Sequence, residues 1–93
     1  MDPNMVRGTV NMILYTIDGV ADLTDQAAAT RYAEDIVNQR GFHGPPSQFV
    51  GAIDAVLRDG HLSEQTLQMS QRHTEGELIE FLRRVRRELP DPA

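Results

Sequence analysis

A capping box followed by an amphipathic stretch is the feature that most constrains how this chain can fold. Thr74 precedes Glu77 by three residues, the spacing at which each side chain accepts a hydrogen bond from the backbone N–H of the other residue. Apolar residues then recur at three- and four-residue steps, at Leu78, Phe81, Leu82, Val85 and Leu89. Pro90 ends the run because proline disfavours helical geometry at the residue before it. The sequence therefore predicts a helix over residues 75–89, whose apolar face must be buried by the rest of the chain.

Two helices are predicted in the first half of the chain. Asp2 precedes Pro3, the order of a capping acid and a first helical residue. Gly19 is one candidate end of this helix, and the apolar stripe also allows it to run to about residue 21. The second helix is expected to follow a cap at Thr24 or Asp22. Gly41 is its expected terminator because glycine adopts the left-handed conformation without steric cost. The apolar face of this second helix consists of Ala29, Tyr32, Ala33, Ile36 and Val37.

Two further helices are predicted before the C-terminal one. Pro45 or Pro46 leads into a third helix with Ser47 near its cap, and Gly60 marks its end. Ser63 is the expected cap of a shorter fourth helix. Between the second and third helices, Phe42 is expected to fold back over the core. The helices are thus joined by connectors of the length usual in helical domains.

These patterns predict the fold class. No run of residues alternates in the manner of a β-strand between turn signals. A chain of 93 residues with 40% hydrophobic residues is long enough for one core and too short for two. We expect an all-α fold, a compact bundle of four to five short-to-medium helices. Residues 1–93 form a single domain in this interpretation, with residues 91–93 as a frayed tail.

Several chemistries lack the residues that they need. The absence of cysteine excludes disulfides, thiolate nucleophiles and cysteine-ligated zinc, and is compatible with a reducing compartment. His43, His61 and His73 lack the spacing of a zinc motif, and no nucleophile elbow or phosphate-binding glycine loop occurs. No signal-like segment or membrane-spanning apolar run is seen. We expect a cytoplasmic protein with no cofactor, no metal and no enzymatic activity.

An acidic set of residues is the first candidate for a binding surface. The formal net charge of −5 favours a basic protein partner and disfavours polyphosphates. Tyr15 lies off the apolar stripe of the first helix and is a natural interface anchor, whereas Tyr32 lies on the stripe of the second helix and is expected in the core. The acidic set that would steer the partner consists of Asp18, Asp22, Asp25, Glu34 and Asp35.

A basic patch in the last helix is the alternative candidate. Its members are Arg83, Arg84, Arg86 and Arg87. They could contact nucleic-acid phosphates, but they also oppose the helix dipole, and Arg84 can pair with Glu80 or Glu88. A solvated helix face is the simpler interpretation.

The function favoured by the sequence is a non-catalytic protein-binding module: a small acidic inhibitor of a basic partner, similar to immunity or antitoxin proteins, or an adaptor. Residues 73–82 resemble the first helix of the small acidic immunity proteins that neutralise nuclease bacteriocins. They lie at the other end of the chain, and the tyrosine-pair motif of that family is absent, so membership is not inferred. The alternatives are a nucleic-acid-binding regulator and a homodimer joined through Met5, Met12 and Leu23.

Overall fold

The computed structural model describes residues 2–90 and confirms the all-α fold. The described chain contains five α-helices and one 3₁₀ helix. In chain order they are α1 (Pro3–Leu14), η1 (Ile17–Gly19), α2 (Gln26–Val37), α3 (Pro46–Asp59), α4 (Glu64–Met69) and α5 (Glu75–Glu88). The frayed tail predicted for residues 91–93 lies outside the described residues. Over residues 2–90, no helix has the length and apolar character needed to cross a lipid bilayer.

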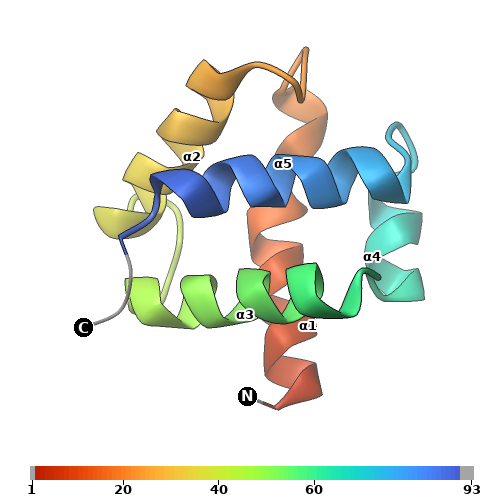
Figure 1. Ribbon diagram of the computed structural model, residues 1–93, viewed down its shortest axis with the longest axis horizontal. Helices are drawn as coiled ribbons and strands as arrows, with labels where there is room; N and C mark the ends of the chain where they lie inside the picture. The colour runs from red at the N-terminus through yellow and green to blue at the C-terminus, as the bar shows by residue number, and fades with distance from the viewer. Residues whose placement is uncertain (1, 91–93) are drawn as a thin grey trace.

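The helices pack around one shared core. α3 and α5 run side by side across one face of the molecule, and α1 crosses behind them (Figure 1). α2 packs chiefly on α5, while α4 lies against α1. The largest fully buried side chains include Phe49, Phe81, Ile13, Leu14, Ile36, Ile53 and Leu82. Every long helix therefore contributes to the same core, as the apolar stripes predict, although Val37 of the stripe predicted for α2 is exposed.

The α5 helix forms as its sequence pattern predicts. Thr74 Oγ1 accepts a hydrogen bond from the Glu77 backbone N–H at 3.2 Å, and Glu77 Oε1 accepts one from the Thr74 backbone N–H at 2.9 Å. The predicted apolar face is buried at Leu78, Phe81, Leu82, Val85 and Leu89. The helix ends at Glu88, one residue before the predicted end, because Leu89 adopts the extended backbone that precedes a proline.

The capping box makes stability depend on pH at Glu77. The hydrogen bond from the Thr74 backbone, with a further contribution from the Thr74 side chain, lowers the pKa of the Glu77 carboxyl below its ordinary value. Because the folded pKa is depressed, the stabilisation is present above the unfolded value and is lost as the pH falls through the folded pKa. We expect Glu77→Gln to unfold at a lower urea concentration than wild type at pH 7, and the gap to narrow as the pH falls below the unfolded pKa and through the folded pKa of Glu77. Parallel midpoints across the acidic range would contradict this role.

The connector between α1 and α2 departs from the prediction. The α1 helix ends at Leu14 and does not run on to residue 21. Ile17 and Val20 are nevertheless buried, and their three-residue spacing suits a 3₁₀ turn, in which positions i and i+3 lie on the same side. The expected cap of α2 at Thr24 or Asp22 is also wrong. Asp25 caps α2 by accepting from the Ala27 N–H at 2.9 Å, and Asp22 instead orders the preceding turn by accepting from the Thr24 N–H at 2.9 Å.

The end of α2 is a Schellman motif in which the left-handed residue is not glycine. Gln39 has a φ of 56° and donates its N–H to the Ile36 carbonyl at 3.2 Å. The next N–H, of Arg40, reaches the Asp35 carbonyl at 2.8 Å. The predicted terminator, Gly41, has a φ of 78° but lies two residues beyond Gln39. The helix therefore closes before Gly41 because the backbone bonds of its last turn are already satisfied at Arg40.

The left-handed backbone of Gln39 predicts that a glycine at this position would stabilise the protein. A side chain in the left-handed region brings its Cβ close to the carbonyl oxygen, so Gln39→Gly should raise the free energy of unfolding by about 0.5–1 kcal/mol. Gln68, exposed within α4, is the matched control, because Gln68→Gly should lower stability by about 0.5–1 kcal/mol. Urea denaturation followed by circular dichroism measures both. A loss of stability in both variants would show that the Gln39 side chain stabilises the turn by other contacts.

The remaining helix ends agree with the prediction in most respects. Pro45 is the N-cap of α3 and Pro46 its first residue, while Gly60 closes the helix with a φ of 74°. The predicted cap at Ser47 is wrong, because Pro45 is the N-cap and Ser47 is the second residue of the helix, which has no side-chain capping bond. Ser63 caps α4 by accepting from the Thr66 N–H at 3.2 Å. Phe42 is buried against Phe49, with ring centroids 5.7 Å apart, as its predicted return to the core requires.

Candidate binding groove

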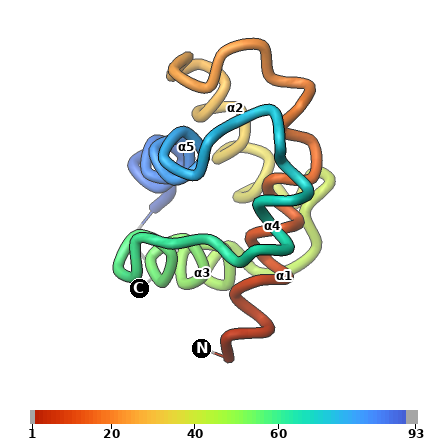
Figure 2. Tube along the Cα trace, turned by 90° about the vertical axis from the view of Figure 1, so that its right-hand side faces the viewer, coloured from red at the N-terminus to blue at the C-terminus, as the bar shows by residue number. Residues whose placement is uncertain are grey.

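A groove of about 500 Å³ lies on the side of the molecule formed by α1, α2, α4 and the connector between α2 and α3. Figure 2 shows α1 and this connector at the right, opposite α5 at the left. Most of the lining is apolar, and the volume falls within the range of pockets that hold small ligands or side chains. The lining residues are Asn11, Met12, Tyr15, Thr16, Tyr32, Asp35, Arg40, Gly41, Phe42 and Met69.

Two large apolar side chains at the rim of this groove are exposed to solvent. Tyr15 is 78% exposed and Met69 is 37% exposed. They are two of the four large hydrophobic residues that are exposed in the described part of the chain, the others being Met5 and Val37. The floor contains the buried rings of Tyr32 and Phe42, whose centroids are 6.1 Å apart. Apolar side chains gathered around a hollow are typical of a binding site.

Hydrogen bonds fix the polar parts of the groove. Thr16 Oγ1 and the Tyr32 hydroxyl lie 2.8 Å apart, which ties the end of α1 to α2. Asn11 Oδ1 accepts a hydrogen bond from the Thr66 hydroxyl, which ties α1 to α4. Asp35 Oδ1 lies 3.2 Å from Arg40 Nε, and these two are the charged residues of the lining. The walls are therefore joined by specific polar contacts as well as by apolar packing.

The structure divides the predicted acidic set between two places. Asp18, Asp22 and Asp25 lie in or beside the connector between α1 and α2. Glu34 and Asp35 lie near the other end of α2, about 14 Å farther along the helix axis. Of these five acids, Asp35 alone lines the groove, where it joins Tyr15. Tyr32 is buried, as its position on the apolar stripe predicts.

A second hollow, of about 340 Å³, brings members of the acidic and basic candidates together. It lies between the turn after η1 and α5, and its lining includes Asp22, Glu77, Glu80 and Arg84. The Thr24 side chain and backbone, both hydrogen-bonded to Asp22, lower the pKa of the Asp22 carboxyl, and Arg84 adds a smaller effect. Asp22 is thus held ionised beside an arginine that the sequence assigned to a different surface.

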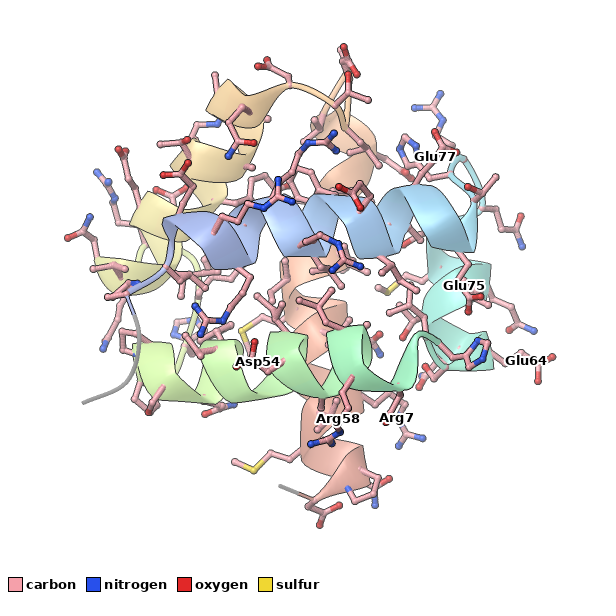
Figure 3. All side chains as sticks on the ribbon, viewed as in Figure 1. Arg7, Asp54, Arg58, Glu64, Glu75 and Glu77 are labelled. Carbon is pink, nitrogen blue, oxygen red and sulfur yellow. The ribbon has the colours of Figure 1, made fainter. Side chains whose placement is uncertain are left out.

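The four predicted arginines do not form one uniform patch. Arg83 Nε lies 3.2 Å from Glu80 Oε2. Glu80 therefore pairs with Arg83, whereas the sequence suggested a pair with Arg84. Arg86 Nε lies 2.8 Å from Asp54 Oδ1, and Figure 3 shows Asp54 on the side of α3 that faces α5. The expected contact of Arg84 with Glu88 is also replaced, because Glu88 Oε1 accepts from Gln26 Nε2 at 3.0 Å. Arg87 is exposed on the last turn of α5.

The three histidines are separated in the structure. His43 is exposed in the connector before α3, and His73 precedes the cap of α5. His61 Nδ1 lies 3.6 Å from Glu75 Oε1 on the surface. Within residues 2–90, no three histidine or acidic side chains come close enough together to hold a metal ion.

Sequence reasoning assigned Tyr15 and Asp35 to one binding surface, but it also assigned four further acids to that surface, and those acids do not line the groove. Met12 was assigned to the homodimer alternative, and Met69 was assigned no role. The useful signal was the presence of apolar side chains outside the helix stripes, at Met12, Tyr15 and Met69. Periodicity describes one helix at a time, so it does not reveal that α1 and α4 place these side chains around one hollow.

Comparison with models of known protein families, with known proteins and with solved structures gives no match for this chain.

Proposed function

We propose that this domain is a non-catalytic protein-binding module that receives an apolar side chain of its partner in the groove. The observation that carries the proposal is Tyr15, which is 78% exposed at the rim of an apolar hollow of about 500 Å³. Tyrosine is enriched among the residues that dominate binding energy at interfaces. Met12 and Met69 add flexible, polarisable surface that adapts to the shape of a ligand.

The partner in this proposal is a basic protein. The net charge of −5 would attract it at long range, and electrostatic steering mainly raises the rate of association. Asp35 places an acid in the groove itself. An inhibitor of the immunity or antitoxin kind, or an adaptor, acting in the cytoplasm would use such a surface, since both roles require binding without chemistry.

Tyr15→Ala tests this proposal. We expect the substitution to weaken partner binding about fivefold or more, because it removes the aromatic contact at the rim. The measurement is affinity capture from the native cell with immobilised wild-type protein, followed by titration of the captured protein against each variant. Met5→Ala is the control, because Met5 is also an exposed apolar residue on α1 but does not line the groove.

The control variant should bind the partner as wild type does. Equal binding by wild type and Tyr15→Ala would contradict the proposal that the groove is the interface. Circular dichroism and thermal melting of both variants establish that the fold is unchanged.

The nucleic-acid alternative has less support from the geometry. Arg83 and Arg86 already contact Glu80 and Asp54 within the domain. A salt-sensitive shift of labelled DNA that disappears with Arg83→Glu and Arg87→Glu together would favour this alternative.

The homodimer alternative loses one of its three residues. Leu23 is buried within the domain, with 5% of its surface exposed, and is therefore not available to a second copy. A molecular mass that rises with concentration in light scattering, and that Met5→Ala reduces, would favour a homodimer.

A further inference from the structure

Asp35 and Arg40 form the one charged contact in the lining of the groove. Asp35 Oδ1 lies 3.2 Å from Arg40 Nε, and the Arg40 backbone N–H also donates to the Asp35 carbonyl at 2.8 Å. The Schellman turn at Gln39 thus brings the arginine back onto the last turns of α2. The contact is an ion pair between an acid in a helix and a base in the connector that follows it.

The two partners of this ion pair differ in how firmly they are held. Asp35 lies within α2, and its side chain is 33% exposed. Arg40 lies beyond the helix end, and its long side chain is 63% exposed. An exposed ion pair of this kind contributes little to stability, because solvent screens it and two side chains must be ordered. The negative charge is therefore carried on a helix that lines the groove, while the positive charge is carried by a longer and more exposed side chain in the connector.

We propose that Asp35 selects a basic side chain of the partner, and that Arg40 occupies the place of that side chain until the partner binds. This inference rests on the proposed function and adds the chemistry of the ligand: an arginine or lysine next to a large apolar side chain. The apolar side chain would fill the hollow between Met12, Tyr15 and Phe42. Exchange of one cation for another leaves the charge of the site unchanged, so the carboxylate is never left without a counter-charge.

The aromatic lining suits the same ligand. Tyrosine and phenylalanine rings attract cations through their faces, and arginine also stacks on them. Tyr15, Tyr32 and Phe42 lie in the same lining as Asp35. A ligand anion would meet the exposed Arg40 but would also meet the carboxylate of Asp35, within a domain of net charge −5. The arrangement consequently favours a cation.

Three blocked dipeptides test the proposal: N-acetyl-leucyl-arginine amide, its citrulline analogue, which is neutral and of nearly the same shape, and its glutamate analogue. The full chain, labelled with ¹⁵N, is titrated with each dipeptide and followed by NMR. We expect chemical-shift changes around Met12, Tyr15 and Gly41, with the arginine dipeptide binding about threefold more tightly than the citrulline one. The glutamate dipeptide should bind most weakly.

Two variants separate the roles of the ion pair. Asp35→Asn should abolish the preference for arginine over citrulline, whereas Arg40→Gln should increase it to about fivefold by removing the internal competitor. Arg58 and Asp59 form a matched control pair, with 3.7 Å between Arg58 Nε and Asp59 Oδ1, at the end of α3 and outside the groove. Figure 3 shows Arg58 extending from the edge of α3 away from α5. Asp59→Asn and Arg58→Gln change the net charge equally and should leave the preference unchanged.

The outcomes decide between the proposals. Equal binding of the arginine and citrulline dipeptides, weaker arginine binding by Arg40→Gln, or shift changes centred on the hollow at Asp22 would each overturn the inference. Tighter binding of the glutamate dipeptide would overturn it as well, since Arg40 would then be the anchor. If Asp35→Asn does not fold, the Arg40→Gln comparison decides alone. Capture of a partner that depends on Tyr15, without charge selectivity, would leave the proposed function standing and remove only this inference.

Discussion

Phe81→Ala should lower the free energy of unfolding by about 3–5 kcal/mol, the loss typical of a large buried aromatic side chain. Phe81 is fully buried on α5 and packs edge to face with Tyr32, with ring centroids 5.2 Å apart. Small domains have a total stability of about 5–15 kcal/mol, so the variant would lose a large fraction of it. Urea denaturation monitored by circular dichroism measures the change.

Tyr15→Ala is the control for Phe81→Ala, because it also removes an aromatic ring but from an exposed position. Its free energy of unfolding should stay within about 0.5 kcal/mol of wild type. A loss below about 1.5 kcal/mol for Phe81→Ala would mean that α5 is not the centre of the core.

Ala29→Leu should be the next most damaging substitution, with a loss of about 1–3 kcal/mol. Ala29 is fully buried on α2, the helix that packs chiefly on α5 (Figure 1). Small residues on this face let the two helices approach closely, and a leucine side chain would force them apart or out of their preferred rotamers. The midpoint of urea denaturation is again the measurement.

Ala27→Leu is the matched control, because Ala27 is an exposed alanine on the same helix. Alanine and leucine both favour helices, so this variant should unfold at nearly the same urea concentration as wild type. If Ala29→Leu were as stable as the control, the interface between α2 and α5 would have to contain unfilled space.

The fold was predictable because each helix carries its own signals. The capping box of α5, the Asp2 and Pro3 start of α1 and the Gly60 end of α3 act through the local backbone, and each lies where the sequence predicts. The errors occurred where several residues compete for one role. Asp22, Thr24 and Asp25 are all capping residues by type, and tertiary packing of Ile17 and Val20 decides where the chain turns into α2.

The groove was not predictable for a different reason. Its parts come from α1, α2, the following connector and α4, and no sequence spacing relates Tyr15 to Met69. The acidic residues suggested one surface because they are close together in the sequence. The length of α2 separates Glu34 and Asp35 from the other three, since each helical residue advances the chain by about 1.5 Å.

Because the groove is built from segments that are far apart in the sequence, a ligand can bind there only when the chain is folded. Because Asn11 and Met69 must both be in place before the hollow exists, the unfolded chain and short peptides cut from it would lack affinity for the partner. A ligand that binds only the native state raises the midpoint of thermal denaturation, by an amount equivalent to about 2.7 kcal/mol at one hundred times its dissociation constant. A melting curve recorded with and without a candidate therefore reports occupancy without any label, and the intact domain is the smallest unit that can respond.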